Sequence, residues 1–237
     1  MNPALVADVI PFSWVDGPGN RFTIFLQGCN FDCRACHNPQ TIPLTSVHAH
    51  NETVESLMQQ ICAAMPHISG VTISGGEATL QADFVYSLFL GLKTAADTRH
   101  LSLFIDTNGS ASTAVWDQLI PVTDGFMVDL KAWPDTLHVE LTGQSNLPVL
   151  AAIRYLARAG KLYEVRLMIV PGINDDPEDL VHIARFLTSI DPTMRVKINH
   201  FHAHGTRSPA SDWAEADADT RESYVQLLRS SGVQHIA

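Results

Sequence analysis

Short apolar runs alternate with longer segments of helical periodicity along most of the chain. Each run is rich in branched and aromatic residues and is bounded by Gly, Pro, Asn or Asp, as buried strands are. Strands are therefore predicted at residues 21–28, 71–74, 101–105, 125–130, 163–170 and 195–199.

The segments between these runs carry apolar residues at helical spacing, which predicts helices between the strands. Asn51 is the expected N-cap of the first helix, which begins near Glu52, and Cys62 lies on the apolar stripe of that helix. Gly160 is the expected C-cap of a later helix. Helices are predicted at about residues 52–65, 80–96, 112–120, 147–159, 176–190 and 219–229, with a further helical piece starting at Pro134.

A strand followed by a helix, repeated about six times, is typical of α/β proteins, because parallel strands need helical crossovers. Six such units fit a partial (β/α)6 barrel of the TIM type. A doubly wound open sheet is the structural alternative, and the pattern alone does not separate the two. The chain of 237 residues is long enough for a substantial core, and we expect a single domain over residues 1–237.

Composition restricts the class of protein without indicating an activity. A hydrophobic share of 46% is ordinary for a globular chain. No apolar stretch is long enough to span a bilayer, and the first residues lack the features of a signal peptide, so we expect a cytoplasmic protein with no membrane partner. The net charge of −10 argues against non-specific binding of nucleic acid.

Three cysteines within eight residues, Cys29, Cys33 and Cys36, give the first chemical signal. Clustered thiols in a reducing compartment favour a metal or redox role over disulfides. A [4Fe–4S] cluster normally takes four thiolates, so three would leave one iron open for a small molecule. A zinc site completed by His37 and a set of buried core thiols are the alternatives. Cys62 is interpreted as a core residue and not as a fourth ligand.

Charged residues and glycines close or follow the predicted strands at the end where the site of a barrel enzyme lies, except Arg166, which lies within the fifth strand. Buried strands rarely end so regularly in charged residues for packing reasons alone. Each residue also has a plain structural interpretation, as part of a turn, a cap or a salt bridge. The set consists of Gly75, Gly76, Glu77, Asp106, Thr107, Asp129, Lys131, Arg166 and His202.

Longer strings around these residues resemble the activating enzymes of glycyl radical enzymes, a group of radical S-adenosylmethionine (SAM) enzymes typified by pyruvate formate-lyase activating enzyme. The resemblance covers nearly the whole chain and is strongest to the YjjW-type branch, through Ile10-Pro-Phe-Ser13 and Phe201-His-Ala-His-Gly205. The strings shared with the wider group are Asp16-Gly-Pro-Gly19, Gln27-Gly-Cys29, Cys36-His-Asn38, Ser74-Gly-Gly-Glu77, Asp106-Thr-Asn-Gly109, Met127-Val-Asp-Leu-Lys131 and Val170-Pro-Gly172.

The resemblance implies a radical SAM core and a mechanism. A reduced [4Fe–4S] cluster passes one electron to SAM, whose S–C5′ bond breaks to give methionine and a 5′-deoxyadenosyl radical. That radical takes a hydrogen from the α-carbon of a glycine on a partner glycyl radical enzyme. A flavodoxin or a ferredoxin is the implied electron donor. The chemistry belongs to the cofactor, while the protein supplies position and shielding from water.

The resemblance also assigns cofactor roles to individual residues. It gives cluster ligation to Cys29, Cys33 and Cys36. The segment that meets the amino group of SAM matches Gly75, Gly76 and Glu77. Positions near the ribose and carboxylate of SAM match Lys131, Arg166 and His202.

Two further sites follow from the same resemblance. A monovalent cation, Na⁺ or K⁺, takes hard oxygen ligands, and its site beside SAM matches Asp106, Thr107, Met127 and Asp129. A loop that holds the glycine-bearing peptide, and that we expect to line the barrel mouth, matches Asp16, Gly17, Pro18 and Gly19. Glycines in such a loop let a backbone approach closely.

The chain departs from the family pattern at two places. YjjW-type members usually carry a ferredoxin-like insert with eight further cysteines, whereas here Cys36-His-Asn-Pro39 runs directly toward the first crossover helix. The residue before the third cysteine is usually aromatic and packs on the adenine, and here it is Ala35. We therefore expect one radical SAM domain without the insert.

Two alternative functions remain at this point. One is a radical SAM enzyme that acts on a small molecule, as 7-carboxy-7-deazaguanine synthases do. The other is a non-enzymatic zinc-binding module, which would be colourless and indifferent to air. The Asp16–Gly19 string and the set Asp106, Met127 and Asp129 favour the activase.

Overall fold

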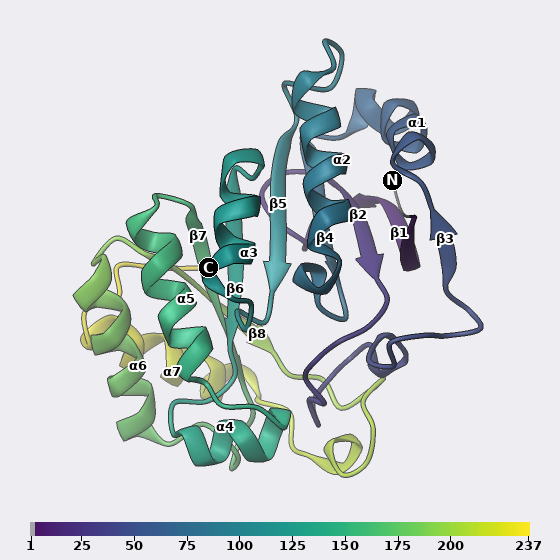
Figure 1. Ribbon diagram of the computed structural model, residues 1–237. Coiled ribbons are helices and arrows are strands. Elements are labelled where there is room, and N and C mark those ends of the chain that lie inside the picture. Colours follow the sequence, from purple (N-terminus) through teal and green to yellow (C-terminus); the bar gives the residue numbers. More distant parts are fainter. Residues whose placement is uncertain (1–2) are drawn as a thin grey trace. The chain divides into compact units, whose positions relative to one another are not determined.

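The computed structural model describes residues 3–237, and its strands form a sheet in the order β3-β1-β2-β4-β5-β6-β7-β8-β9 (Figure 1). The strands are β1 Ala4–Ser13, β2 Arg21–Leu26, β3 His50–Glu52, β4 Gly70–Gly75, β5 Ser102–Thr107, β6 Gly125–Leu130, β7 Leu162–Ile169, β8 Arg195–His200 and β9 His235–Ile236. The α-helices are α1 Val54–Ala64, α2 Ala82–Thr94, α3 Thr113–Leu119, α4 Asp135–Thr142, α5 Leu147–Arg158, α6 Pro177–Ile190 and α7 Ala218–Ser230.

Short 3₁₀ helices complete the secondary structure: η1 Pro39–Thr41, η2 Met65–His67, η3 Ala78–Gln81, η4 Ile120–Val122 and η5 Ala210–Asp212. Within the described residues 3–237, no helix has the length and apolar character needed to cross a membrane. The α/β class is confirmed, because β2, β4 and β5 pair in parallel, as do β7, β8 and β9, with helices in the crossovers.

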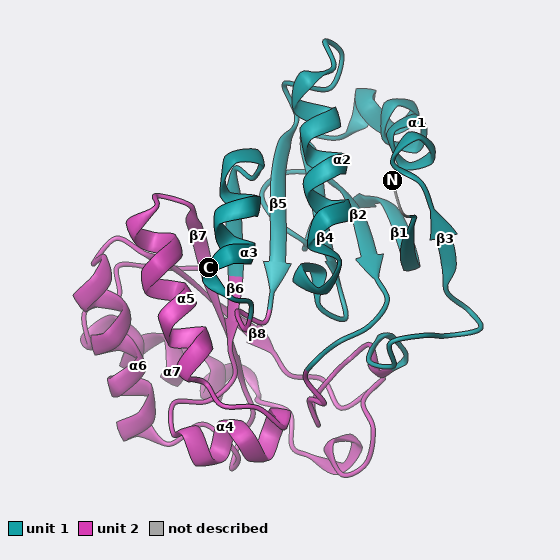
Figure 2. Cartoon of the chain, in the orientation of Figure 1, with its two compact units in different colours: residues 1–30, 40–107, 111–127 teal, residues 31–39, 108–110, 128–237 magenta. Residues whose placement is uncertain are grey.

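The chain divides into two compact units, shown in different colours in Figure 2. Unit 1 comprises residues 1–30, 40–107 and 111–127, and unit 2 comprises residues 31–39, 108–110 and 128–237. The expectation of a single domain stays a prediction, and each unit is described by itself.

In unit 1, the strands have one polar and one apolar face. The register sets Thr23 beside Thr72 and Thr72 beside Phe104, so these residues share a face with Arg21 and Ser74. The opposite face carries Val71, Ile73 and other fully buried aliphatic side chains, and Figure 1 shows α2 along β4 and β5. One face of this sheet is therefore a conventional core, while the other offers polar groups to its surroundings.

In unit 2, strand β7 also has one polar and one apolar face. Glu164, Arg166 and Met168 alternate with Val165 and Leu167 along the strand, and Arg166 pairs with Lys197 of β8. The helix α5, which has a buried apolar stripe, contacts β7 within the same unit. Asp176 caps α6 by accepting hydrogen bonds from the N–H of Glu178 (2.8 Å) and of Asp179 (3.4 Å), as its acidic first turn predicts.

The structure corrects three details of the first units. Strands β1 and β3 were not predicted, and β1 runs antiparallel to both β2 and β3. Asn51 belongs to β3 and is not a cap; Thr53 is the N-cap of α1, and its Oγ1 accepts the N–H of Ser56 at 3.1 Å. Cys62 is exposed, so its assignment to the core was wrong.

Candidate active site

In unit 1, backbone hydrogen bonds hold the segment that leads into the cysteine loop. Beyond β2, the N–H of Gly28 donates to the carbonyl of Thr41 (2.8 Å) and the N–H of Cys29 to that of Ile42 (3.0 Å). A methyl group on Gly76 would lie 2.2 Å from the carbonyl oxygen of Gly28. Because Gly76 has no side chain, the backbone at Gly28 can pack directly against it.

Glu77 has a structural role that the sequence did not indicate. Its side chain is 1% exposed, and Oε1 accepts hydrogen bonds from Thr79 N–H (2.9 Å), Thr79 Oγ1 (2.6 Å) and Thr107 Oγ1 (2.7 Å). Its own N–H donates to the carbonyl of Gly28 at 2.8 Å. Oε1 of this carboxylate thus caps η3 and also binds Thr107. Nearby, Asp106 Oδ2 accepts a hydrogen bond from Ser74 Oγ at 3.0 Å.

In unit 2, the rest of the cysteine loop is fastened to the end of α4. The N–H groups of Asp32 and Arg34 donate to the last carbonyls of that helix, those of Thr142 (2.8 Å) and Leu141 (2.9 Å). Such carbonyls have no partner within a helix, so the loop satisfies them. Arg207 adds a hydrogen bond to the Cys33 carbonyl at 3.2 Å.

Burial raises the pKa of the Cys36 thiol above its ordinary value. The N–H of Asn38 and the charges of Lys131 and Arg207 oppose this shift, while Asp129 adds to it. The protein alone therefore favours the thiol form at this position, and binding of iron would displace the proton.

Ala35, the departure from the family pattern, is 7% exposed and packs with Val170, Phe201 and Ala210. The rings of Phe201 and Trp213 lie beside one another, with centroids 6.0 Å apart. A small residue at position 35 leaves room for this apolar cluster of unit 2.

Each of the three residues predicted near the ribose and carboxylate of SAM has an acidic neighbour in unit 2. Lys131 Nζ lies 2.7 Å from Asp129 Oδ2, Arg166 Nε lies 2.9 Å from Glu164 Oε1, and His202 Nδ1 lies 3.0 Å from Glu215 Oε2. The Arg166 pair is buried, whereas the side chain of His202 is 61% exposed. Each of the three residues could still donate hydrogen bonds to a ligand, but the acids balance the charges of Lys131 and Arg166.

The loop of residues 16–19 lies at the opposite end of β2 from Cys29. Ser13 pairs with Arg21 at the start of β2, and Val6 pairs with Leu26 at its end. The two ends of this strand are about 17 Å apart, at roughly 3.3 Å per residue. The loop is therefore at the other end of β2 from Cys29, while its expected place at the barrel mouth and its role with a peptide stay predictions.

Sequence reasoning missed Asn174, which lies in unit 2 just after the Val170–Gly172 turn. Its Nδ2 donates to the carbonyls of Lys131 (2.7 Å) and Met168 (2.8 Å), and its Oδ1 accepts from the N–H of Val170 (2.7 Å). One buried amide thus joins the ends of β6 and β7. In the sequence, Asn174 is only an asparagine that follows a Pro-Gly turn. Its role cannot be inferred until the positions of the neighbouring strand ends are known.

The fit of a metal cluster rests on the chemistry of the donor set. Among residues 3–237, no group of three or more His, Cys, Asp or Glu side chains is arranged so that it could hold a metal ion. None of the four cysteines forms a disulfide in the described residues, and Cys29, Cys33 and Cys36 are half-buried within one short loop. Three soft ligands of this kind suit iron and sulfide.

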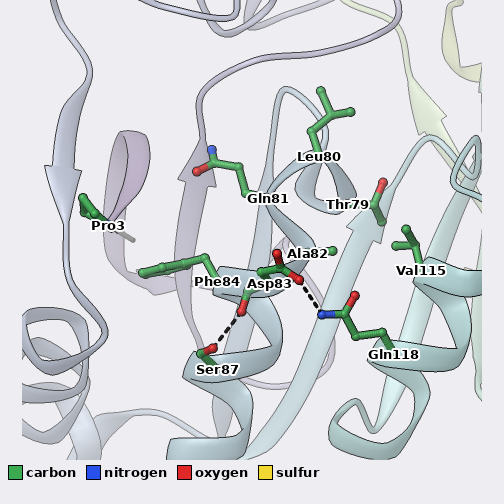
Figure 3. A pocket seen from close by; sticks show the side chains of 10 residues that line it. All are labelled: Pro3, Thr79, Leu80, Gln81, Ala82, Asp83, Phe84, Ser87, Val115 and Gln118. Atoms are coloured by element: carbon green, nitrogen blue, oxygen red, sulfur yellow. Dashed lines mark hydrogen bonds between the residues drawn. The ribbon is translucent and has the colours of Figure 1, made fainter. Parts of the chain in front are cut away.

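A surface hollow of about 520 Å³ lies in unit 1 at the start of α2 (Figure 3). Asp83 is one of the residues that line it. Its Oδ1 accepts a hydrogen bond from Gln118 Nε2 at 2.8 Å, and its backbone carbonyl accepts one from Ser87 Oγ at 2.8 Å. None of the predicted site residues lines this hollow, and we assign no ligand to it.

Comparison with known proteins gives a consistent result. The Radical SAM superfamily profile matches residues 23–187. Pyruvate formate-lyase-activating enzyme of Streptococcus mutans is 34% identical over 209 residues, which is 85% of this chain and 78% of the relative. Pyruvate formate-lyase 1-activating enzyme of Escherichia coli K12 is 36% identical over 198 residues, covering 81% and 78%.

The solved structure of a radical SAM methyltransferase from Sphaerobacter thermophilus aligns with a TM-score of 0.71 and 18% identity, over 92% of this chain and 65% of that one. At this level of identity the likeness concerns the fold alone, and it agrees with the partial barrel expected from the sequence.

Proposed function

The chain belongs to the radical SAM superfamily, and from this membership we propose that it is the activating enzyme of a glycyl radical enzyme. The observation that carries the proposal is the identity of 34% and 36%, over more than three quarters of each relative, to two pyruvate formate-lyase activating enzymes. The same match argues against the zinc-binding module and leaves small-molecule chemistry as the weaker candidate.

Membership of the superfamily brings a [4Fe–4S] cluster and SAM. We propose Cys29, Cys33 and Cys36 as the cluster ligands. When bound, the cluster supplies one electron that cleaves SAM to methionine and a 5′-deoxyadenosyl radical, which takes a hydrogen atom from the partner's glycine. Cys62, exposed on α1, is outside the proposed set.

The remaining residues position SAM. Gly75 and Gly76 hold the segment before Cys29, and Glu77 would act through the backbone because its carboxylate is engaged by Thr79 and Thr107. Lys131, Arg166 and His202 would donate hydrogen bonds to the ribose and carboxylate. The acidic neighbours of Lys131 and Arg166 balance their charges, so these residues would contribute orientation more than net charge.

We further propose a monovalent cation, Na⁺ or K⁺, at the ends of β5 and β6. Asp106, Thr107, Met127 and Asp129 supply oxygen and backbone ligands of the kind that hard cations take. The cation would offset the negative charge of the two acids beside SAM.

Asp16, Gly17, Pro18 and Gly19 would hold the partner's peptide. Because this loop is about 17 Å from the far end of β2, the bound segment would need about five residues in extended form to cover that length. Asp16→Ala should therefore reduce glycyl radical formation more than it reduces cleavage of SAM without partner. Equal losses would mean that Asp16 supports SAM or the fold.

The proposal also covers the setting in which the enzyme works. A flavodoxin or a ferredoxin would donate the electron, and a reducing cytoplasm would keep the thiols available for iron. The net charge of −10 gives no reason to propose a nucleic-acid partner.

The test is anaerobic reconstitution with iron and sulfide, followed by reduction with dithionite and addition of SAM and pyruvate formate-lyase. A brown protein that releases 5′-deoxyadenosine and produces a glycyl radical signal in electron paramagnetic resonance is the expected result. A second glycyl radical enzyme, of different substrate, serves as the second partner. A loaded enzyme that cleaves SAM but produces the signal on neither partner would refute the proposal.

A further inference from the structure

Arg21, the first residue of β2, is completely buried in unit 1. Its Nε donates to Thr72 Oγ1 at 3.0 Å, its Nη1 to Ser102 Oγ (2.6 Å) and the Pro18 carbonyl (3.3 Å), and its Nη2 to the carbonyls of Val71 (2.6 Å) and Ser102 (2.7 Å). A guanidinium has five N–H donors, so these five contacts use all of them.

Two of the contacts lead to the loop of residues 16–19. The contact to Pro18 reaches the loop directly. The contact to Thr72 reaches it in two steps, because Thr72 Oγ1 in turn donates to the carbonyl of Asp16 at 2.7 Å. The guanidinium therefore fixes two carbonyls of the loop against the start of β4 and β5.

The surrounding backbone leaves space for this group and for nothing larger. A methyl group on Gly70 would lie 2.1 Å from Arg21 Nη1 and 2.2 Å from the carbonyl oxygen of Ser102. Gly17 adopts a φ of +135°, which L side chains rarely adopt, and sits close to Thr72 and Arg21. The ring of Phe104 covers the guanidinium at 4.9 Å. The site is thus built around an arginine at this position.

We propose that Arg21 is a positioning residue for the partner's glycine segment. It holds the backbone of residues 16–19 in one conformation through Pro18 and Thr72, so the partner does not have to order the loop when it binds. The inference rests on the proposed function, because it takes the loop to be the contact for the partner's peptide. Arg21 itself touches neither SAM nor the peptide in this account.

Thr72 and Thr23 provide a matched pair of variants. Both are fully buried and lie directly beside one another on the same face of β4 and β2. Thr72 Oγ1 links Arg21 to Asp16, whereas Thr23 Oγ1 has no hydrogen-bond partner among the described residues. Thr72→Val removes the link without changing the volume, and Thr23→Val makes the same chemical change with no link to remove.

The first measurement uses the protein without cluster or partner. Hydrogen–deuterium exchange should be about tenfold faster at residues 14–20 in Thr72→Val, the factor that loss of one hydrogen bond allows, and unchanged in Thr23→Val. Arg21→Lys should produce at least the same effect, since an ammonium cannot reproduce the planar fork of donors. Equal exchange in Thr72→Val and wild type would overturn the anchoring role.

The second measurement uses the reconstituted enzyme with pyruvate formate-lyase and with a second glycyl radical enzyme. Thr72→Val should raise KM for the partner about tenfold and leave the rate of SAM cleavage without partner unchanged. An unchanged KM would overturn the inference while leaving the proposed function intact. A wild-type enzyme that forms no glycyl radical on either partner would instead refute the proposed function, and with it the role given to the loop.

Discussion

Gly76→Ala tests the close packing that holds the start of the cysteine loop. The added methyl carbon would lie 2.2 Å from the carbonyl oxygen of Gly28, 2.6 Å from its carbonyl carbon and 2.6 Å from the carbonyl oxygen of Thr41. All three are backbone atoms that no side-chain rotation can move. Overpacking of this kind costs about 2 kcal/mol, and disturbing the Gly76–Leu26 and Glu77–Gly28 hydrogen bonds adds about 1 kcal/mol.

Urea unfolding of the cluster-free protein measures this cost. A loss of about 3 kcal/mol moves the midpoint down by about 1 M, at an m-value near 3 kcal/mol/M. Gly91→Ala is the control, because its nearest neighbour is the mobile Met58 sulfur at 3.0 Å and alanine favours a helix. Iron content after reconstitution should also fall in Gly76→Ala, since Gly28 precedes Cys29. Equal midpoints for the two variants would refute the packing argument.

Three other predictions concern the cluster, the cation and a buried histidine. Cys62→Ala should keep about four irons per chain after reconstitution, and loss of the cluster with the fold intact would contradict the proposed ligand set. Exchange of potassium or sodium for a bulky organic cation should lower the rate of SAM cleavage about tenfold, as loss of a charged ligand would; rates indifferent to that exchange, with Asp129→Asn fully active, would remove the site. Burial lowers the pKa of the fully buried His138 below its ordinary value, against the opposing effects of the Gln144 carbonyl and Asp135. Because the folded state then favours the neutral ring, the free energy of unfolding should fall as pH drops below about 6.5. His138→Gln should reduce that slope in urea titrations at several pH values, and an unchanged slope would show that other groups cause it.

The sequence predicted the parallel part of the sheet because its strands are continuous apolar runs. β6, at Gly125–Leu130, was predicted to the residue, and β4, β5, β7 and β8 within one or two residues. β1 was missed because Asp8 and Pro11 interrupt its pattern, as residues of a strand with exposed positions do. β3 has three residues, too few to show any period.

Cys62 shows where a helical stripe misleads. Apolar residues at positions 54, 57, 58, 61, 62 and 65 make a wide stripe, but the buried side of α1 consists of Val54, Leu57, Ile61 and Ala64. Cys62 lies past the edge of that side and is exposed. Periodicity gives the direction of the core, whereas the width of the covered face depends on the elements that pack there.

The motif residues were found from their types and spacing, but their contacts were not. Glu77 proved to be a buried cap, and Arg166 forms the buried ion pair that its plain structural interpretation predicts. Arg21 gave no signal, since an arginine before an apolar run normally marks the solvent-exposed start of a strand. Its partners Ser102 and Thr72 are distant in sequence, and only the register of three strands brings them together.

The central claim is that a glycine of a partner enzyme gives up its hydrogen atom, and isotope transfer tests this most directly. The partner is prepared with deuterium on its glycine α-carbons and is incubated anaerobically with reduced, reconstituted enzyme and SAM. The account predicts 5′-deoxyadenosine that carries one deuterium, formed in step with a glycyl radical signal on the partner. The account would be contradicted if the enzyme cleaved SAM at full rate, the 5′-deoxyadenosine carried no deuterium, and the partner showed no glycyl radical signal.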